Sequence, residues 1–340
     1  MVRSQAPGAC VSGNLLVAAA SIAVMEGAKP IVIGLDAVIV AVSAATPRVV
    51  VVVDGKGGDA LPSGPFDPER DRTLQLGVRR WVEERTNVEI GYLEQLYTFG
   101  DRYRHPDERA GGARTVSIGY LALVRERDSH DARGATWSSW YQYLPWEDWR
   151  TGRPAAALGP IERHLRRWIA DAPRLPLRRS RRDRVDLTFG FTGRPWNDEA
   201  VLERYELLFE AGFAPEAGRG ELPVTAATVG RPMSLDYRRM LATGIGRLRG
   251  KIKYRPVIFD LLPPTFTLLQ LQQTAEAIAG MPLHKGNFRR LVVAGGLVEA
   301  TGGTVAATGG RPAAEFRFRR EVLREREAGV RLRAARLASR

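Results

Sequence analysis

The first third of the chain has the hydrophobic pattern of an α/β domain. Two Val- and Ile-rich runs lie within residues 31–53 on either side of a TPR break, which predicts a hairpin of two buried strands. Apolar side chains recur at helical spacing over residues 73–86. Strand-like runs follow at 92–99 and 115–124. We therefore expect a mixed sheet with a helix against it.

The middle of the chain combines a tryptophan cluster with helical stretches. Residues 137–149 hold four of the seven tryptophans, which we interpret as a packing surface rather than a ligand-stacking wall. The arginine-rich segment 171–184 predicts an exposed basic loop. Amphipathic helices are expected over 198–212 and 234–251, the second with Ser234 as its N-cap.

The last hundred residues predict a different architecture. Residues 254–264 suggest a strand or extended arm stopped by two prolines. A helix is expected over 267–280, followed after a short turn by a basic helix over 284–296. Runs at 297–301 and 313–319 then predict a β-hairpin, which completes the order of a winged helix-turn-helix. The side chains expected to face inward from the second helix are Phe288, Leu291 and Val292.

The composition suits a globular protein that is long enough for two domains. Of its 340 residues, 44% are hydrophobic and 26% are charged. The formal net charge is +13, which favours a polyanionic partner. A coding bias toward arginine is the alternative origin of that charge.

Cysteine and histidine usage limits the chemistry. Cys10 is the single cysteine, so no internal disulfide can form, and the four histidines lack metal-ligand spacing. We expect no metal and no required cofactor, and a reducing, cytoplasmic setting. The apolar stretch 15–24 resembles the core of a secretory signal, but its basic flank is weak. We instead expect residues 1–30 to be a disordered extension, with no membrane-spanning segment.

The loop and helix at 61–90 resemble the Nudix box, G-x(5)-E-x(7)-R-E-U-x-E-E-x-G-U. In active Nudix enzymes the glutamates of this motif hold Mg²⁺ ions that bridge a diphosphate and activate water. When Arg80 is aligned with the arginine of the motif, Glu84 retains one of the carboxylates.

The other carboxylate positions of the motif are changed. Trp81 falls where the first helical glutamate belongs, and Arg85 replaces a later one. Arg72 occupies the position of the loop glutamate, and Asn87 that of the glycine. Cations in place of anions cannot hold Mg²⁺ in the usual way, so we expect no hydrolysis and no catalytic residue.

A pocket without chemistry can still bind a ligand, because arginine binds phosphate directly. Solvated arginines at these positions are the alternative. The residues expected to line such a ligand pocket are Arg72, Arg80, Glu84, Arg85, Tyr97, Phe99 and Asp101.

Two stretches resemble a known family. The run YLEQLYTFGD (92–101), followed by VSIGYLALV (116–124), is similar to the Nudix half of the Nudix-related transcriptional regulators of NAD metabolism. Residues 247–318 resemble the C-terminal DNA-binding domain of that family, with FTLxxLQ, NFRR and GGRPAxxFRF in order. The resemblance implies a pocket that senses a nucleotide and commonly lacks catalytic carboxylates.

The resemblance covers about residues 33–125 and 234–319, and the insertion at 126–232 departs from the compact members. That departure resembles a longer sub-family that regulates NAD biosynthesis. ADP-ribose is the effector that the family implies, with NAD or ATP as substitutes.

The expected fold is α/β: an N-terminal Nudix-like α/β/α sandwich with a mixed sheet, plus a C-terminal winged helix-turn-helix. Its parts are the extension 1–30, a Nudix-like sensing domain with insertion (31–232), a linker helix (233–253), the winged helix-turn-helix (254–320) and a basic tail (321–340).

The second helix of the motif is the expected recognition helix. Lys285 and Arg289 lie four residues apart on one face, and Asn287 and Arg290 share a neighbouring face. Arginine pairs with guanine and asparagine with adenine in the major groove. The full set of expected DNA contacts is Thr267, His284, Lys285, Asn287, Arg289, Arg290 and Arg311, the last in the wing.

These patterns predict a repressor of NAD biosynthesis genes that binds double-stranded operator DNA as a homodimer and responds to an NAD-related nucleotide. The alternative is an active Nudix pyrophosphohydrolase acting on ADP-ribose or a similar nucleoside diphosphate derivative. A basic scaffold or RNA-binding protein is a third hypothesis, but the phenylalanines near the basic residues have core spacing.

Overall fold

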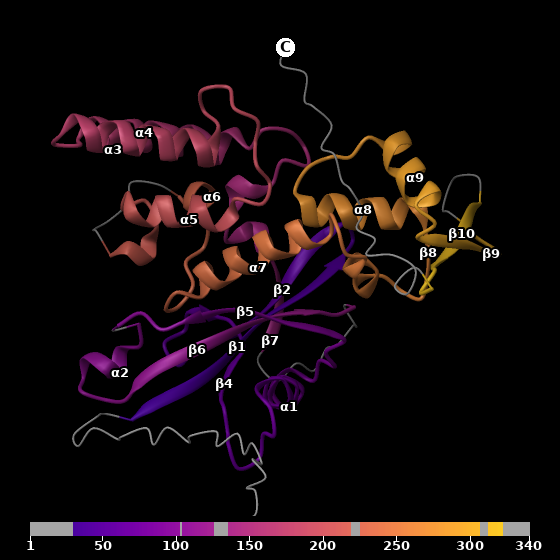
Figure 1. The fold of residues 1–340 in the computed structure, drawn as a ribbon, viewed down its shortest axis with the longest axis horizontal. Helices are drawn as coiled ribbons and strands as arrows, with labels where there is room; N and C mark the ends of the chain where they lie inside the picture. The colour runs from indigo at the N-terminus through magenta and orange to yellow at the C-terminus, as the bar shows by residue number, and fades with distance from the viewer. Residues whose placement is uncertain (1–29, 103, 126–134, 219–224, 307–311, 322–340) are drawn as a thin grey trace, which may run out of the picture.

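The computed structural model describes residues 30–102, 104–125, 135–218, 225–306 and 312–321 (Figure 1). The predicted N-terminal extension up to residue 29, the wing residue Arg311 and the basic tail from residue 322 lie outside the described residues. Among the residues described, no helix is both long and apolar enough to cross a lipid bilayer.

A mixed β-sheet forms the N-terminal part. Strand β1 (Ile31–Ser43) pairs antiparallel with β2 (Thr46–Val53) and parallel with β6 (Arg114–Leu123). The order of the main path is β3-β2-β1-β6-β5. The remaining strands are β3 (Asp59–Ala60), β4 (Ser63–Pro65), β5 (Tyr92–Phe99) and β7 (Ala135–Ser139). The expected hairpin and mixed sheet are confirmed.

The hairpin turns two residues earlier than predicted. Ala44 and Ala45 have φ of 47° and 57°, whereas the TPR segment already lies in β2. A two-residue turn with both residues left-handed matches the twist of the flanking strands, so it forms even without glycine. The proline lies near the start of β2, where an interruption of the ladder costs little.

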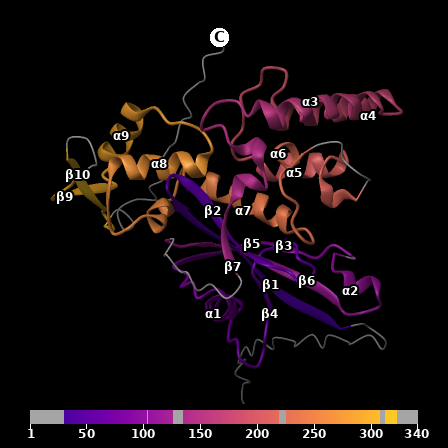
Figure 2. The same ribbon diagram turned by 180° about the vertical axis from the view of Figure 1, so that it is seen from behind.

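Two helices cover the two faces of the sheet (Figures 1 and 2). Helix α1 (Leu74–Thr86) packs on the face of β1 that carries Leu35 and Ile39. The opposite face carries Val38 and packs against α7 (Tyr237–Lys251). Gly244 allows this close approach, because a Cβ there would lie 3.0 Å from the Val38 side chain.

The insertion is mainly helical. It contains α3 (Ala155–Ala170), α4 (Leu175–Phe189), α5 (Val201–Glu210) and α6 (Ala226–Val229), with short 3-10 turns η1 (Trp140–Gln142), η2 (Pro145–Glu147) and η3 (Pro215–Ala217). Trp140 and Trp146 are completely buried, so the tryptophan cluster is a packing surface as predicted.

The predicted basic loop at 171–184 is wrong, because most of it belongs to α4. Pro176 lies in the first helical turn, where its fixed φ favours a helix start. Val185 and Phe189, one helical turn apart, are buried and anchor the far end. The arginines remain on the exposed sides of this helix, which is why composition alone suggested a loop.

The C-terminal part is a winged helix-turn-helix. Helices α8 (Leu268–Ala279) and α9 (Lys285–Ala294) precede the hairpin β9 (Val298–Val305) and β10 (Ala313–Phe318), and β8 (Thr265–Thr267) joins the same sheet. A short helix, α2 (Pro106–Arg109), lies in the loop between β5 and β6.

Three local predictions need correction. Residues Val257–Leu261 form a 3-10 helix, η4, instead of a strand, because Val257, Ile258 and Leu261 bury around a tight turn. Ser234 does not cap α7, which begins at Tyr237; its hydroxyl donates to Asp54 at 2.5 Å. Leu291 is 41% exposed and does not face the core of the winged helix.

A buried ionic cluster fastens the insertion to the linker helix. Glu147 accepts hydrogen bonds from Arg204 of α5 at 2.6 and 2.9 Å and from Arg249 of α7 at 2.6 Å. All three side chains are 0% exposed. Burial opposes ionisation of the carboxyl, but the two guanidinium groups outweigh it and hold the pKa of Glu147 below its ordinary value.

The Glu147 cluster (Glu147, Arg204 and Arg249) also reaches the neighbouring helices. Arg249 donates to the carbonyl of Ile278 in α8 at 2.9 Å, and Arg204 donates to the carbonyl of Thr188 in α4 at 3.0 Å. A buried charge is tolerated only when it is paired and hydrogen-bonded. The cluster therefore fixes α4, α5, α7 and α8 relative to one another.

A second ionic link joins the sheet to α7. Arg104 donates to both carboxylate oxygens of Asp236 at 2.7 and 2.8 Å and to the Ser117 hydroxyl at 2.6 Å. Its guanidinium also lies 3.7 Å from Asp36 of β1. Burial raises the pKa of the Asp36 carboxyl to about 6, against the pull of Arg104.

We predict that Gly280 is indispensable to the contact between α8 and the Glu147 cluster. Gly280 ends α8 with φ of 73°, and a Cβ there would lie 2.5 Å from the Glu147 carbonyl oxygen. Gly280→Ala should lower the free energy of unfolding by about 2–4 kcal/mol, measured by urea denaturation. Gly218, with φ of 61° and nothing within 4 Å, is the matched control. Gly218→Ala should cost about 1 kcal/mol, and equal losses would contradict the steric argument.

Asp36 should make stability depend on pH in a defined direction. Its pKa rises from 3.8 to about 6 on folding, so the stability it contributes is full below about pH 4 and is lost as the pH rises through about 6. Asp36→Asn should therefore be more stable than the wild type by about 2–3 kcal/mol at pH 7, with the difference vanishing near pH 4.

Urea denaturation between pH 4 and pH 7 measures this dependence. Asp54 supplies a control of opposite sign, because hydrogen bonds from Ser234 and Gly58 lower its pKa. The stability that Asp54 contributes is present at neutral pH and is lost on acidification. Parallel curves for Asp36→Asn and the wild type would contradict the prediction.

Candidate functional site

Helix α9 presents a polar face on a buried anchor. Phe288 and Val292, one turn apart, are buried and hold the helix against the winged-helix core. His284 caps the helix by accepting a hydrogen bond from the Asn287 N–H at 3.3 Å. The segment from Lys285 onward therefore has one face in the core and another in solvent.

The side chains of α9 that were predicted to contact DNA differ in their exposure to solvent. Lys285, Asn287 and Arg290 are exposed, and Arg290 donates to the side-chain oxygen (Oδ1) of Asn287 at 3.2 Å, so these two share a face as predicted. Arg289 is half-buried, with its Nε atom enclosed. Gly286 adds no side chain to the exposed surface, which leaves room for a close approach of another molecule.

Thr267 has a structural function at the start of α8. Its hydroxyl oxygen accepts from the Gln270 N–H at 3.2 Å, and its own N–H donates to the Gln270 side chain at 2.8 Å. This capping box satisfies the helix end, and the threonine is buried. The Thr267 hydroxyl, which was predicted to contact DNA, is thus turned toward the helix.

Two residues that sequence reasoning missed set the turn between α8 and α9. The amide of Gln272 donates to Glu276 at 2.9 Å and to the Leu283 carbonyl at 3.2 Å. Glu276 in turn accepts from the Leu283 N–H at 2.9 Å. These bonds fix how α9 projects from α8. The sequence feature that could have indicated them is a glutamine and a glutamate four residues apart on one helix, a spacing that brings side chains into contact.

Arg80 is engaged within the Nudix-like domain. Its guanidinium donates to both oxygens of Asp71 at 2.8 Å and to Glu84 at 3.2 Å. The hydrogen bonds from Arg80 lower the pKa of the buried Asp71 carboxyl. Gly77 makes room for this pair, since a Cβ there would lie 2.8 Å from the Asp71 carboxylate. Arg80 thus holds the loop before α1.

Trp81 fills the place where the motif has its first helical glutamate. The indole is buried, and a Cβ on Gly64 would lie 3.1 Å from it. Arg72 and Arg85 are exposed at the two ends of α1. No group of three His, Cys, Asp or Glu side chains within the described residues is placed to hold a metal ion.

A cavity of about 520 Å³ lies beside the C-terminal half of α1 and is lined by Arg80, Glu83, Glu84 and Asn87. The structure does not bring all the predicted ligand residues to it. Phe99 is buried on the opposite face of the sheet, in the core that α7 shares.

The loop after β5 also faces α7. Asp101 pairs with Arg239 at 2.6 Å, and Tyr97 is 64% exposed and lies edge-on to Phe99. A register shift in β5 between Gln95 and Thr98 changes which side chains reach each face. Sequence alternation alone could not place this shift.

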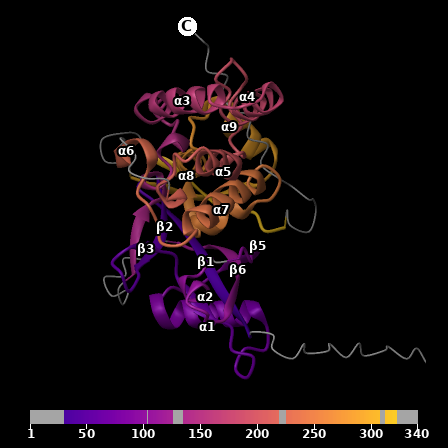
Figure 3. The ribbon, with the colours of Figure 1, turned by 90° about the vertical axis from the view of Figure 1, so that its left-hand side faces the viewer.

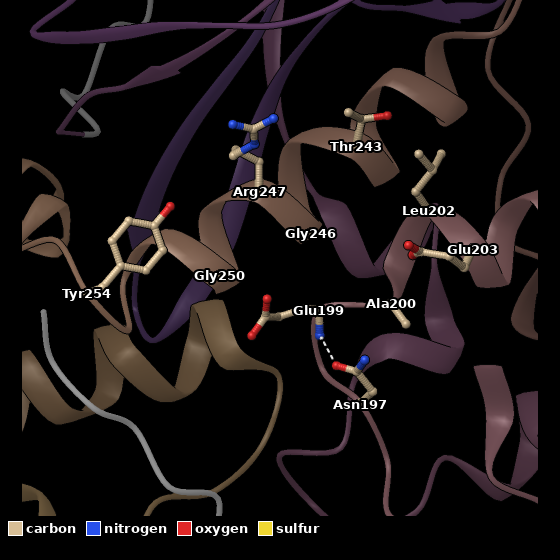
Figure 4. Close-up of a pocket in the computed structure, with 10 residues that line it drawn as sticks. All are labelled: Asn197, Glu199, Ala200, Leu202, Glu203, Thr243, Gly246, Arg247, Gly250 and Tyr254. Carbon is tan, nitrogen blue, oxygen red and sulfur yellow. Dashed lines mark hydrogen bonds between the residues drawn. The ribbon is translucent and has the colours of Figure 1, made fainter. Parts of the chain in front are cut away.

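A second cavity, of about 470 Å³, lies between α5 and α7 (Figure 4). Figure 4 shows the side chains of Glu199, Glu203 and Arg247 around it. Gly246 and Gly250 let the loop before α5 approach, because a Cβ on either would lie 2.9 or 3.1 Å from Glu199.

Comparison with known proteins finds relatives of the winged helix and of a longer stretch of the chain. Residues 258–318 match the family described as the NrtR DNA-binding winged helix domain. The ADPR responsive transcriptional repressor NtrR of Acinetobacter baylyi is 38% identical over 242 residues, 71% of this chain. The match covers 62% of the length of that relative.

Solved structures show the same fold. NrtR of Shewanella oneidensis complexed with a 27mer DNA superposes with a TM-score of 0.53 at 19% identity, covering 85% of this chain and 94% of that one. The same protein without DNA gives a TM-score of 0.52. The expected architecture, a Nudix-like α/β domain plus a winged helix, is confirmed. The resemblance seen in the sequence is also confirmed: residues 258–318 are similar to the NrtR DNA-binding winged helix domain, and the chain is similar to an ADPR responsive transcriptional repressor.

Proposed function

We propose that the protein is a transcriptional repressor of NAD-metabolism genes that binds operator DNA through α9 and senses ADP-ribose in its Nudix-like domain. The observation that carries the proposal is the exposed face of α9, where Arg290 and Asn287 lie side by side on a buried anchor. Arginine and asparagine are the side chains that pair bidentately with guanine and adenine.

The Nudix-like domain is proposed to bind a nucleotide without hydrolysing it. Trp81 occupies a carboxylate position, and Arg80 is committed to Asp71. Arg72 and Arg85 are free to meet the phosphates of a ligand beside α1. ADP-ribose is favoured over NAD and ATP because the relative from Acinetobacter baylyi responds to it. A pyrophosphohydrolase remains the alternative.

The two ionic links suggest how a ligand signal reaches the winged helix. Arg104 joins the sheet to α7 through Asp236, and Arg249 of α7 joins the end of α8. A shift of the sheet would therefore move α7 and α8 together. A nucleotide releases DNA by this route only if it binds the DNA-incompetent arrangement more tightly.

The remaining expectations are part of the same proposal. A cytoplasmic homodimer would place two copies of α9 on a near-palindromic operator, with half-sites one or two helical turns apart. We assign residues 31–232 to the sensing domain, 233–253 to the linker helix and 254–320 to the DNA-binding domain.

An electrophoretic mobility shift tests the proposal. The full-length protein is mixed with DNA from upstream of its own gene and of neighbouring NAD-biosynthesis genes, with competitor DNA, and then with ADP-ribose, NAD or ATP. We expect a discrete shift that ADP-ribose abolishes. A shift insensitive to all three nucleotides would contradict the effector assignment. Absence of any specific shift, together with Mg²⁺-dependent hydrolysis of ADP-ribose, would favour the hydrolase.

We further predict that Arg290 contributes sequence discrimination. Arg290→Ala should weaken operator binding by about 10- to 100-fold while changing binding to random DNA little. Lys285→Ala should weaken both and reduce the salt dependence by about one phosphate contact. Titrations of fluorescent duplexes measure these effects. Arg109→Ala, an exposed change in α2, is the control, and an operator affinity unchanged by Arg290→Ala would contradict the prediction.

A further inference from the structure

The helical hairpin of α3 and α4 forms a basic arm on the surface of the insertion. Residues 155–189 hold nine arginines against four carboxylates, although the chain as a whole has 51 basic and 38 acidic residues. The hairpin is therefore a concentrated source of positive charge. Neither the winged helix nor the Nudix-like domain explains it.

Some arginines of the arm have a structural function. Arg181 lies over the Trp168 ring at 4.2 Å and donates to the Trp168 carbonyl, and Arg178 donates to the Ala170 carbonyl at 2.9 Å. Arg184 pairs with Glu210 at 2.5 Å. These contacts hold α4 against α3 and α5.

Arg179 and Arg182 differ from these. They lie three residues apart, so they share the outer face of α4, and both are exposed. Neither has an ion-pair partner among the described residues. Asp183 lies beside them and is also exposed, but the arm as a whole carries nine arginines against four carboxylates, so its net charge favours an anion.

The arm has a fixed position relative to the winged helix. Arg204 donates to the carbonyl of Thr188 in α4 and to the Glu147 carboxylate. Arg249 donates to the same carboxylate and to the Ile278 carbonyl in α8. Every side chain in this series is buried. The outer face of α4 is thus held rigidly with respect to α8, the helix that precedes α9.

Figures 1 and 3 both place α4 and α9 along one edge of the molecule, on the side of α8 that faces away from the sheet. A duplex bound to α9 and continuing along this edge would pass the outer face of α4. DNA carries one phosphate charge for about every 1.7 Å of its axis, so a rigid pair of arginines at the edge meets phosphates whatever the sequence.

We propose that the outer face of α4, with Arg179 and Arg182, is a second DNA-contacting surface that binds the phosphate backbone of the duplex flanking the operator. This inference rests on the proposed function of α9. Arg182 and Arg179 supply affinity and orientation, whereas α9 supplies sequence discrimination.

An anionic membrane surface would attract the same charges, but the exposed apolar side chains do not support it. Leu175, Leu177 and Leu187 lie near the two ends of α4 and point to different sides of the helix. A membrane-surface helix needs a continuous apolar face. The common edge with α9 favours duplex DNA.

The test compares Arg179→Gln/Arg182→Gln with the matched control Arg70→Gln/Arg109→Gln. The control removes the same charge from exposed positions near α1 and α2, at the other end of the molecule (Figure 1). Glutamine retains helix propensity, and equal thermal unfolding of the variants and the wild type verifies the fold. Binding is measured from 50 to 300 mM salt on two duplexes, the minimal operator and the operator with added flanking sequence.

On the longer duplex we expect the α4 variant to bind roughly 10-fold more weakly than the wild type, with the slope of log affinity against log salt reduced by about 0.9 for each lost phosphate contact. On the minimal operator the wild type and both variants should bind alike. The control should match the wild type throughout.

The outcomes separate the two proposals. If the wild type binds the operator specifically but the α4 variant has the same affinity and salt slope on both duplexes, the arm is not a DNA surface and the function of α9 stands. If the wild type shows no specific binding to either duplex, the proposed function itself fails, and the arm inference with it.

Discussion

The buried Glu147 carboxylate and its two arginines are the constraint on which the arrangement of this protein depends. Three charges leave water completely, which is unfavourable unless each is paired and the remaining donors find carbonyl oxygens. The packing of the four helices around Glu147 meets that condition. An apolar core of the same volume would tolerate small shifts of α8 against α7, whereas this one does not, because any shift leaves a buried charge without its partner. The backbone at Gly280 lies so close to Glu147 that no side chain fits at that position.

The sequence predicted the elements whose patterns are local and repetitive. The hairpin of β1 and β2, the start of α1 at Thr73 and the extent of α8 follow from periodicity. It did not predict features that depend on partners far along the chain. The Glu147 cluster joins residues 57 and 102 positions apart, and Arg104 meets Asp236 across 132 positions. No spacing rule connects such residues. One signal was available, because Asp36 interrupts an otherwise apolar strand and a charge there implies a buried partner.

The candidate sites were predicted unevenly for the same reason. The face shared by Asn287 and Arg290 follows from helical geometry alone and was placed correctly. The ligand set was only half assembled: Arg80 and Glu84 share α1, but Phe99 and Asp101 lie on the other side of the sheet. A single register shift in β5 decides that outcome. The commitment of Arg80 to Asp71 likewise depends on the space that Gly77 leaves, which composition cannot reveal. In helix α1, Trp81 is buried in the core and Arg80 is paired with Asp71.

The position of Arg249 also determines where this protein can be divided. Its guanidinium belongs to the linker helix, yet it satisfies the Ile278 carbonyl at the end of α8. A winged helix cut from the chain at residue 254 would lose that donor, and the bond from the Trp149 N–H to the Gly280 carbonyl, in one step. The last turn of α8 would also lose the cover of α7, so apolar side chains such as Ile278 would be exposed to water. The unit that folds is therefore larger than the winged helix at residues 258–318.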